Sequence, residues 1–228
     1  MNTENAFELL SPLIKEKLSA LNISTPTAVQ NKIIPIILNN KNVLFQSETG
    51  TGKTFAYLLP LVEKLEHDID KTSVKIVITA PTFELASQIN IAAKSITERK
   101  TALFIGGAPL KRQIETLKDK PQIVIGTPAR LVELINLKTL KVANASAVIF
   151  DETDRMVKKE LIEPTSALKE AMPQNIQVIA CSATINAQVS KFFNNDESII
   201  MPEEDVLKKM ITHWAIYEEY REKIDVLR

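Results

Sequence analysis

Cysteine is nearly absent from this sequence: its 228 residues contain one, Cys181. That scarcity excludes an internal disulfide framework and is typical of a reducing compartment. The first ten residues, MNTENAFELL, lack the basic and apolar regions of a secretory signal. No apolar run approaches the roughly 18 residues that a membrane span needs. We therefore expect a cytoplasmic protein without membrane association.

Net charge is absent as well, because 28 Lys and Arg residues balance 28 Asp and Glu residues. Global charge gives no support to nucleic-acid binding, so any basic surface must be local. His67 and His213 have no cysteine or histidine partners at ligand spacing, which argues against a zinc site. The composition, 45% hydrophobic and 25% charged, is that of a globular protein with one large α/β domain or a domain plus an appendage.

Short apolar runs alternate with amphipathic helical patterns along most of the chain. The apolar runs are nearly continuous, which is typical of strands buried on both faces of a parallel sheet. Their order predicts an α/β fold, a mostly parallel open sheet with helices on both faces, and ligands at the carboxyl ends of the strands. Predicted strands are 43–46, 75–79, 101–105, 122–125, 147–150 and 177–180; predicted helices are 12–21, 27–38, 53–65, 84–95, 110–118, 129–135 and 186–193.

The character of the chain changes near residue 200, where a polar stretch is followed by a strand pattern at 211–217 and a charged helical pattern. We expect residues 1–205 to form the main domain. Residues 206–228 are then a linker and the start of an incomplete second domain.

The segment SETGTGKT (47–54) follows the first predicted strand and opens a helix. Gly50 and Gly52 let the backbone curl so that successive N–H groups point at phosphate oxygens, aided by the helix N-terminus. Lys53 would reach the β- and γ-phosphates, and the Thr54 hydroxyl would complete a Mg²⁺ shell. The strict phosphate-loop pattern has glycine where this chain has Ser47. The alternative is a glycine- and threonine-rich turn with an exposed lysine.

A second segment, the acidic DETD (151–154), directly follows the strand predicted at 147–150. Asp151 would hold Mg²⁺ through water, and Glu152 is placed to accept a proton from an attacking water. Two acids at the solvated end of a strand are the alternative. We expect the Thr153 hydroxyl to be satisfied by nearby backbone, leaving the acids intact.

Further short motifs carry a family resemblance. TPTAVQ (25–30), SETGTGKT (47–54), PTFELA (81–86), GG (106–107), TPAR (127–130), DETD and SAT (182–184) stand in this order. Over residues 7–200 the sequence resembles the DEAD-box ATP-dependent RNA helicases of superfamily 2. The resemblance implies an N-terminal RecA-like P-loop domain that uses ATP and Mg²⁺ and couples ATP hydrolysis to RNA unwinding or remodelling.

The resemblance also implies roles at the nucleotide. Catalysis is assigned to Glu152, Asp151 and Lys53, and metal binding to Thr54 and Asp151. Gln30 would pair with adenine, and Phe7 would stack on it. A surface position for Gln30 and a core position for Phe7 are the alternatives. The remaining nucleotide-binding residues are those of the phosphate loop: Ser47, Glu48, Thr49, Gly50, Thr51, Gly52, Lys53 and Thr54.

RNA-binding and coupling residues follow from the same resemblance. The RNA-binding residues would contact the phosphate backbone of RNA, so we expect little specificity for the RNA sequence. Gly106 and Gly107 could instead form a plain tight turn, and Arg130 could instead pair with a carboxylate on its own helix. The SAT segment could be a strand-end turn. The RNA residues are Pro81, Thr82, Glu84, Gly106, Gly107, Thr127, Pro128 and Arg130; the coupling residues are Asp154, Ser182 and Thr184.

Three positions depart from the family pattern: Phe83 replaces arginine, Ala129 replaces glycine, and Thr153 replaces alanine. We expect Phe83 to pack beneath its loop rather than stack on a base, and Ala129 to weaken RNA binding modestly. The family's second RecA-like domain is the expected partner within a monomer, because it supplies arginines that complete the site. Alone, this half is expected to have little activity.

Two other functions remain open on the sequence. A non-catalytic RNA-binding module is suggested by Phe83 and Ala129, and opposed by the intact Lys53, Asp151 and Glu152. A DNA-dependent translocase of the same superfamily is opposed by the segment that ends at Gln30. An assay of RNA-stimulated ATP hydrolysis distinguishes a helicase from the non-catalytic module. Comparing the stimulation of hydrolysis by RNA and by DNA distinguishes a helicase from the DNA-dependent translocase.

Overall fold

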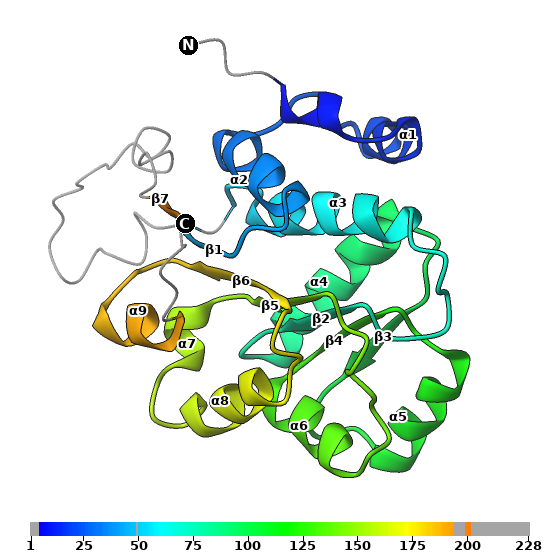
Figure 1. Ribbon diagram of the computed structural model, residues 1–228, viewed down its shortest axis with the longest axis vertical. Helices are drawn as coiled ribbons and strands as arrows, with labels where there is room; N and C mark the ends of the chain where they lie inside the picture. The colour runs from blue at the N-terminus through cyan, green and yellow to red at the C-terminus, as the bar shows by residue number, and fades with distance from the viewer. Residues whose placement is uncertain (1–4, 49, 194–198, 202–228) are drawn as a thin grey trace, which may run out of the picture.

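The structure is a computed structural model that describes residues 5–48, 50–193 and 199–201. Its centre is a seven-stranded sheet in the order β3-β4-β2-β5-β6-β1-β7, in which every strand pairing is parallel (Figure 1). The strands are β1 (Val43–Gln46), β2 (Ile76–Thr79), β3 (Thr101–Phe104), β4 (Ile123–Gly126), β5 (Ala147–Phe150), β6 (Gln177–Ser182) and β7 (Ile199–Met201).

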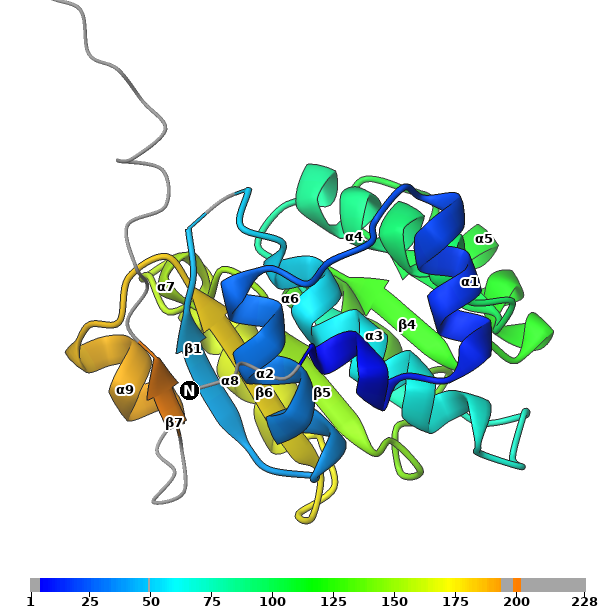
Figure 2. The same cartoon turned by 90° about the horizontal axis from the view of Figure 1, so that it is seen from above.

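Helices cover both faces of this sheet. One face carries η1 (Ala6–Leu9), α1 (Pro12–Ala20), α2 (Ala28–Leu38), α3 (Lys53–Glu66) and α4 (Phe83–Ile96). Figure 2 looks onto α1, α2 and α3 with the sheet behind them. The other face carries α5 (Leu110–Thr116), α6 (Pro128–Asn136), α7 (Thr153–Met156), α8 (Ile162–Glu170) and α9 (Ala187–Phe193); the short helix η2 (Leu117–Asp119) continues α5.

The two faces of the sheet are both apolar, because successive strand residues alternate between two buried clusters. In β5, Ile149 joins the cluster under α2, α3 and α4, whereas Val148 and Phe150 join the cluster under α6 and α8. Continuous apolar strands therefore produce two cores separated by one sheet. This arrangement confirms the predicted α/β fold with a parallel open sheet.

The predicted elements recur with small shifts at their ends. The strands predicted at 43–46 and 147–150 have the observed bounds of β1 and β5, whereas β6 extends two residues further, to Ser182. The helices α7 and α8 and the strand β7 were not predicted. The α8 sequence, IEPTSALKE, has Pro164 in its first turn and few apolar residues, so its pattern is weak.

The predicted second-domain segment at 206–228, with its strand at 211–217, lies outside the described residues. Within the residues that the structure describes, none of the helices combines the length and apolar character of a membrane span.

The end of β4 requires glycine. A Cβ at Gly126 would lie 2.2 Å from the carbonyl oxygen of Phe104 in the neighbouring strand β3. That carbonyl accepts a hydrogen bond from the N–H of Thr127 at 3.1 Å, so it cannot move without breaking the start of the next loop. Gly106 differs, because no atom lies within 4 Å of a Cβ at this position.

Replacing Gly126 with alanine is expected to lower the free energy of unfolding by about 3 kcal/mol, the upper end of the cost of overpacking. The matched change Gly106→Ala should alter it by less than about 0.5 kcal/mol. Urea unfolding followed by circular dichroism measures both values. Equal stabilities of the two variants would contradict the close approach of β3 to β4.

Candidate functional site

The candidate residues gather at one edge of the sheet because parallel strands end on the same side. Strands β5, β6 and β1 are neighbours, so the segments that follow them, 151–154, 182–184 and 47–54, lie side by side. The contact is direct: the N–H of Ser47 donates to the carbonyl of Ser182 at 2.9 Å. The sheet thus brings together the three segments predicted to handle a nucleotide.

The loop between β1 and α3 is built on two glycines with left-handed backbone. Gly50 and Gly52 both have φ of 86°. Lys53 then opens α3, and its ammonium Nζ is buried without a hydrogen-bond partner among the described residues. A buried ammonium costs free energy unless it is paired, so this geometry favours an anion beside Lys53. The predicted exposed-lysine alternative does not fit a residue that is 6% exposed.

Ser47, where the strict loop pattern has glycine, is fully buried. Its hydroxyl hydrogen-bonds with the hydroxyl of Thr51, which in turn donates to the carbonyl of Glu48 at 2.8 Å. The serine therefore cross-links the start and the middle of the loop. Thr49 lies outside the described residues.

Asp151 lies at the end of β5 and is fully buried. The Tyr57 hydroxyl donates to its Oδ2 at 2.8 Å, and the Cys181 thiol donates to its Oδ1 at 2.9 Å. Burial raises the pKa of Asp151, while the Cys181 hydrogen bond, the positive charge of Lys53 and the Tyr57 hydrogen bond act in the opposite direction. Lys53 and Asp151 thus place opposite charges in one buried region.

Tyr57 and Cys181 remain protonated donors in this environment. Burial raises the pKa of both groups well above their usual values, and the charge of Asp151 raises them further. A side-chain hydrogen bond with Thr54 acts in the opposite direction on Tyr57. Neither residue was among the predicted site residues. The sequence offers one signal for Tyr57, which is four residues after Lys53 and so on the same face of a predicted helix. Cys181 lies opposite Asp151 through the parallel pairing of Phe150 with Ala180, a register that the sequence does not give.

Glu152, the predicted proton acceptor, has left-handed backbone with φ of 55°. This conformation is uncommon for a residue with a side chain and costs about 1 kcal/mol. Glu152 Oε2 lies 2.6 Å from Nη1 of Arg155, whose side chain is half exposed. The carboxylate is therefore at the rim of the site and paired with a cation that solvent can reach.

The DETD and SAT segments are joined by hydrogen bonds. The Thr153 hydroxyl lies 2.9 Å from the carbonyl of Phe150 and 3.1 Å from that of Cys181, so the backbone satisfies it, as predicted. The N–H of Asp154 donates to Ser182 Oγ at 3.1 Å, and the Thr184 hydroxyl donates to Asp154 Oδ2 at 3.0 Å. The two segments are thus directly bonded to each other.

Gln30 is buried, at 3% exposed, so it is not the surface residue of the alternative interpretation. Its Oε1 accepts from the N–H of Thr27 at 3.0 Å in a capping box, and its Nε2 donates to the carbonyl of Gly52 at 3.0 Å. One N–H and one lone pair of the amide remain for a ligand. Phe7 is 5% exposed and belongs to the core, in agreement with its core-anchor alternative.

The predicted RNA residues follow the adjacent strands β2, β3 and β4. Thr82 and Thr127 are the N-cap residues of α4 and α6, Pro81 is partly exposed, and Glu84 lies exposed in the first turn of α4. Pro128 is buried in the first turn of α6.

Gly106 and Gly107 are exposed, and Gly107 has φ of 79°. Arg130 supports this loop from below: its Nη1 donates to the carbonyl of Ala108 at 3.1 Å, and its Nε lies 2.8 Å from Glu133 on the same helix. The guanidinium is therefore engaged within the fold, as in the alternative that pairs Arg130 with its own helix.

The expectation that Phe83 packs beneath its loop is wrong. Its side chain is 49% exposed at the first position of α4, where the helix start projects from the sheet edge. A residue at the first turn has no turn before it to cover its ring. Ala129 is also exposed, on α6.

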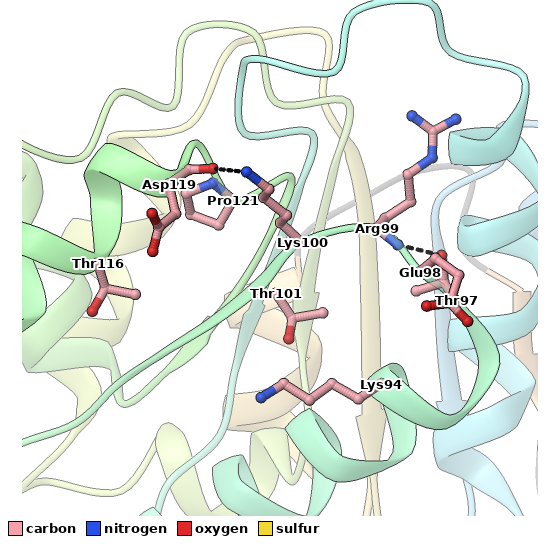
Figure 3. A pocket seen from close by; sticks show the side chains of 9 residues that line it. All are labelled: Lys94, Thr97, Glu98, Arg99, Lys100, Thr101, Thr116, Asp119 and Pro121. Carbon is pink, nitrogen blue, oxygen red and sulfur yellow. Dashed lines mark hydrogen bonds between the residues drawn. The ribbon is translucent and has the colours of Figure 1, made fainter.

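A hollow of about 550 Å³ at the opposite edge of the sheet lies beside the start of β3 and is lined by Lys94, Thr97, Lys100 and Thr101, among others (Figure 3). Two of its charged groups are engaged within the fold: Lys100 donates to the carbonyl of Asp119 at 3.0 Å, and Arg99 is bound to Glu66. None of the residues that the motifs single out lines this hollow, so the carboxyl edge remains the candidate functional site.

Fold and site together define a RecA-like domain with a phosphate loop. The sequence profile described as DEAD/DEAH box helicase matches residues 27–192. The chain belongs to this family of DEAD/DEAH box helicases.

Curated relatives agree with the assignment. The chain is 36% identical to the DEAD-box ATP-dependent RNA helicase CshB of Bacillus subtilis (strain 168), over 98% of this chain and 53% of the relative. It is 32% identical to CshA of the same organism, over 97% of this chain and 46% of that relative. The chain thus spans about half the length of these curated relatives.

Solved structures are similar as well. A DEAD box protein from the hyperthermophile Methanococcus jannaschii superposes with a TM-score of 0.80 at 28% identity, over 96% of this chain and 60% of that one. Mss116p bound to ssRNA and AMP-PNP gives a TM-score of 0.76 at 28% identity, over 85% and 43%.

The buried charge of Asp151 leads to a prediction about stability without metal or nucleotide. Since burial raises the pKa of Asp151 above its ordinary value of 3.8 in the folded state, the ionised carboxylate costs stability. The full cost is present at pH values above the raised pKa of the folded state. It disappears as the pH falls to the pKa that Asp151 has in the unfolded chain. We expect Asp151→Asn to melt at a higher temperature than the parent chain at pH 7 in EDTA.

Thermal unfolding at a series of pH values from 7 down to 4 measures the difference in melting temperature between Asp151→Asn and the parent chain. This difference should become smaller as the pH falls. Asp119→Asn, at an exposed position of η2, is the control, and its melting temperature should stay close to that of the parent chain at every pH. A lower melting temperature for Asp151→Asn at pH 7 would contradict this account of the buried charge.

Proposed function

We propose that this chain is the N-terminal ATP-binding half of an ATP-dependent RNA helicase, in which ATP hydrolysis is coupled to the unwinding or remodelling of RNA. The observation that carries the proposal is the buried Lys53 ammonium, which has no hydrogen-bond partner among the described residues. It follows two left-handed glycines and lies near the buried Asp151. The relatives CshB and CshA carry the name of this activity.

The residues present fit a nucleotide with a magnesium ion. Gly50 and Gly52 free the backbone N–H groups at the start of α3 for phosphate oxygens, and Lys53 supplies the cation. Thr54 and Asp151 offer the oxygen ligands that Mg²⁺ prefers, directly or through water. When bound, the metal neutralises charge on the phosphates. Gln30 retains one donor and one acceptor for an adenine edge.

Glu152 would act as the proton acceptor for the attacking water in this proposal. Its pairing with Arg155 at 2.6 Å holds the carboxylate at the rim, and release of Arg155 frees an oxygen. Because Asp154 binds both Ser182 and Thr184, a shift at Glu152 passes to the SAT segment. This connection is the proposed link between hydrolysis and movement of RNA.

RNA would lie across the ends of β2, β3 and β4. The exposed Gly106 and Gly107 allow close approach of a phosphate backbone, and the N-terminus of α4 offers N–H groups beside Thr82. Mss116p, a similar structure, is bound to ssRNA and AMP-PNP, which supports RNA and a nucleotide as the ligands of this fold. A second RecA-like domain would complete the site, and this half alone would have little activity. The additional length of the relatives leaves room for such a domain.

Lys53→Ala should remove detectable binding of ATP to this chain, because the loop loses its only buried cation. Fluorescence titration with a labelled, non-hydrolysable ATP analogue and Mg²⁺ measures the affinity. Lys141→Ala, at an exposed site before β5, is the matched control and should bind as the parent does. Normal affinity of the Lys53 variant would refute the phosphate-loop assignment.

Glu152→Gln, placed in the longer protein that contains the second domain, should reduce RNA-stimulated ATP hydrolysis about a hundredfold or more while ATP and RNA binding persist. The reason is that an amide cannot accept the proton but keeps the shape of the side chain. Glu163→Gln, exposed in α8, serves as the control. Parent-like turnover of the Glu152 variant would sink the role of this residue, and an unmodified protein without RNA-stimulated hydrolysis would favour the non-catalytic module.

A further inference from the structure

The carboxylate of Asp151 is held by two donors from two other elements. Tyr57 reaches it from the second turn of α3, and Cys181 reaches it from β6. Each donor binds a different oxygen, Tyr57 at Oδ2 and Cys181 at Oδ1, at 2.8 Å and 2.9 Å. All three side chains are fully buried.

Two hydrogen bonds to two oxygens define the plane of a carboxylate. An aspartate with one partner can rotate about its Cβ–Cγ bond, since that torsion is broad. Here rotation breaks at least one bond in a buried place, and a buried polar group left without a partner costs about 1–3 kcal/mol. The orientation of Asp151 is therefore fixed before any ligand arrives.

The same contacts leave room for a metal. A carboxylate has about four lone-pair sites, and the tyrosine and the thiol occupy one on each oxygen. One lone pair on each oxygen remains. Tyr57 lies three residues after Thr54 on α3, so the helix that carries one proposed Mg²⁺ ligand also carries a donor to the other.

Packing alone does not call for these two residue types. A phenylalanine ring would fill nearly the same space as Tyr57, and an alanine or valine would suit the apolar neighbours of Cys181 in β6. What distinguishes Tyr57 and Cys181 from such residues is a proton to donate. The donors are aimed at the one buried carboxylate that the proposed function assigns to the metal.

We propose that Tyr57 and Cys181 are positioning residues that hold the Asp151 carboxylate in the orientation that receives the magnesium ion of a bound nucleotide. They touch neither the nucleotide nor the metal in this account. The inference rests on the proposed function, because it presumes that Asp151 serves a metal. Hydrogen-bond partners of metal-binding carboxylates commonly change metal affinity by about 10- to 100-fold when removed.

The test uses the 228-residue chain and a fluorescent, non-hydrolysable ATP analogue. Tyr57→Phe and Cys181→Ala each remove one donor, and Cys181→Ser keeps an O–H donor at the same place. The Mg²⁺ concentration that gives half-maximal metal-dependent binding is measured at a fixed analogue concentration. Analogue affinity in EDTA is measured in parallel, because Asp151 takes no part in binding there.

We expect the half-maximal Mg²⁺ concentration to rise about tenfold in Tyr57→Phe and in Cys181→Ala, and to return most of the way to the parent value in Cys181→Ser. Affinity in EDTA should stay within about twofold of the parent, the scatter of a typical surface substitution. The double variant Tyr57→Phe/Cys181→Ala should show less than the product of the two single effects, because both donors hold one carboxylate.

Thr97→Val is the matched control, since it removes a buried hydroxyl that donates to Glu66 at the opposite edge of the sheet, away from the candidate site. It should leave the Mg²⁺ dependence unchanged. Circular dichroism establishes folding for every variant; if Cys181→Ala does not fold, Tyr57→Phe and Cys181→Ser carry the test.

Three results separate the possibilities. A parent chain whose analogue binding ignores Mg²⁺ overturns the proposed metal role of Asp151, and the inference falls with it. Metal-dependent binding in the parent with unchanged Mg²⁺ dependence in Tyr57→Phe overturns the inference alone. Equal losses of affinity with Mg²⁺ and in EDTA also overturn it, because they indicate a structural role in the fold.

Discussion

Two buried charges of opposite sign, Lys53 and Asp151, impose the constraint on which this site depends. Burial makes both charged forms unfavourable. The ammonium has no hydrogen-bond partner among the described residues, and burial raises the pKa of the carboxyl. Both sit at the ends of elements that the parallel sheet brings together, with β1 and β5 on either side of β6. A ligand that carries negative charge for the first and a cation for the second relieves both.

The scaffold around these charges is correspondingly rigid. The start of the phosphate loop is bonded to the end of β6 through Ser47 and Ser182, and the Thr153 hydroxyl spans the carbonyls of β5 and β6. Placing threonine in the third position of DETD therefore adds a connection between neighbouring strands and leaves both acids in place. The substitution changes the framework, because the partners of the Thr153 hydroxyl are backbone carbonyls and not the carboxylates of Asp151 and Glu152.

Much of the fold could be predicted, because continuous apolar strands and amphipathic helices are local patterns. The ends of β1 and β5 were placed to the residue, whereas α8 was missed because its periodicity is weak. The motifs also single out residues, such as Lys53 and Asp151, that the structure brings into one buried region. A sequence motif does not identify the residues on neighbouring strands and helices that form hydrogen bonds with each site residue.

Three outcomes illustrate that limit. Tyr57 and Cys181 were missed because their hydrogen bonds depend on the register of β5 against β6 and on the face of α3, which are tertiary facts. The position of Arg130 left two roles open, and its pairing with Glu133 and Ala108 became visible only in three dimensions. Phe83 was placed under its loop from its apolar character, although the first turn of a helix offers no cover.

The side chain of Gln30 has a consequence for how nucleotide identity is sensed. Its Nε2 binds the carbonyl of Gly52, the residue directly before Lys53, while its Oε1 accepts from the N–H of Thr27 at the start of α2. In the proposed function one amide therefore contacts the base and also the hinge of the loop that contacts the phosphates. On that proposal, discrimination among nucleotides and alignment of the phosphates would be linked through the bond from Gln30 to Gly52.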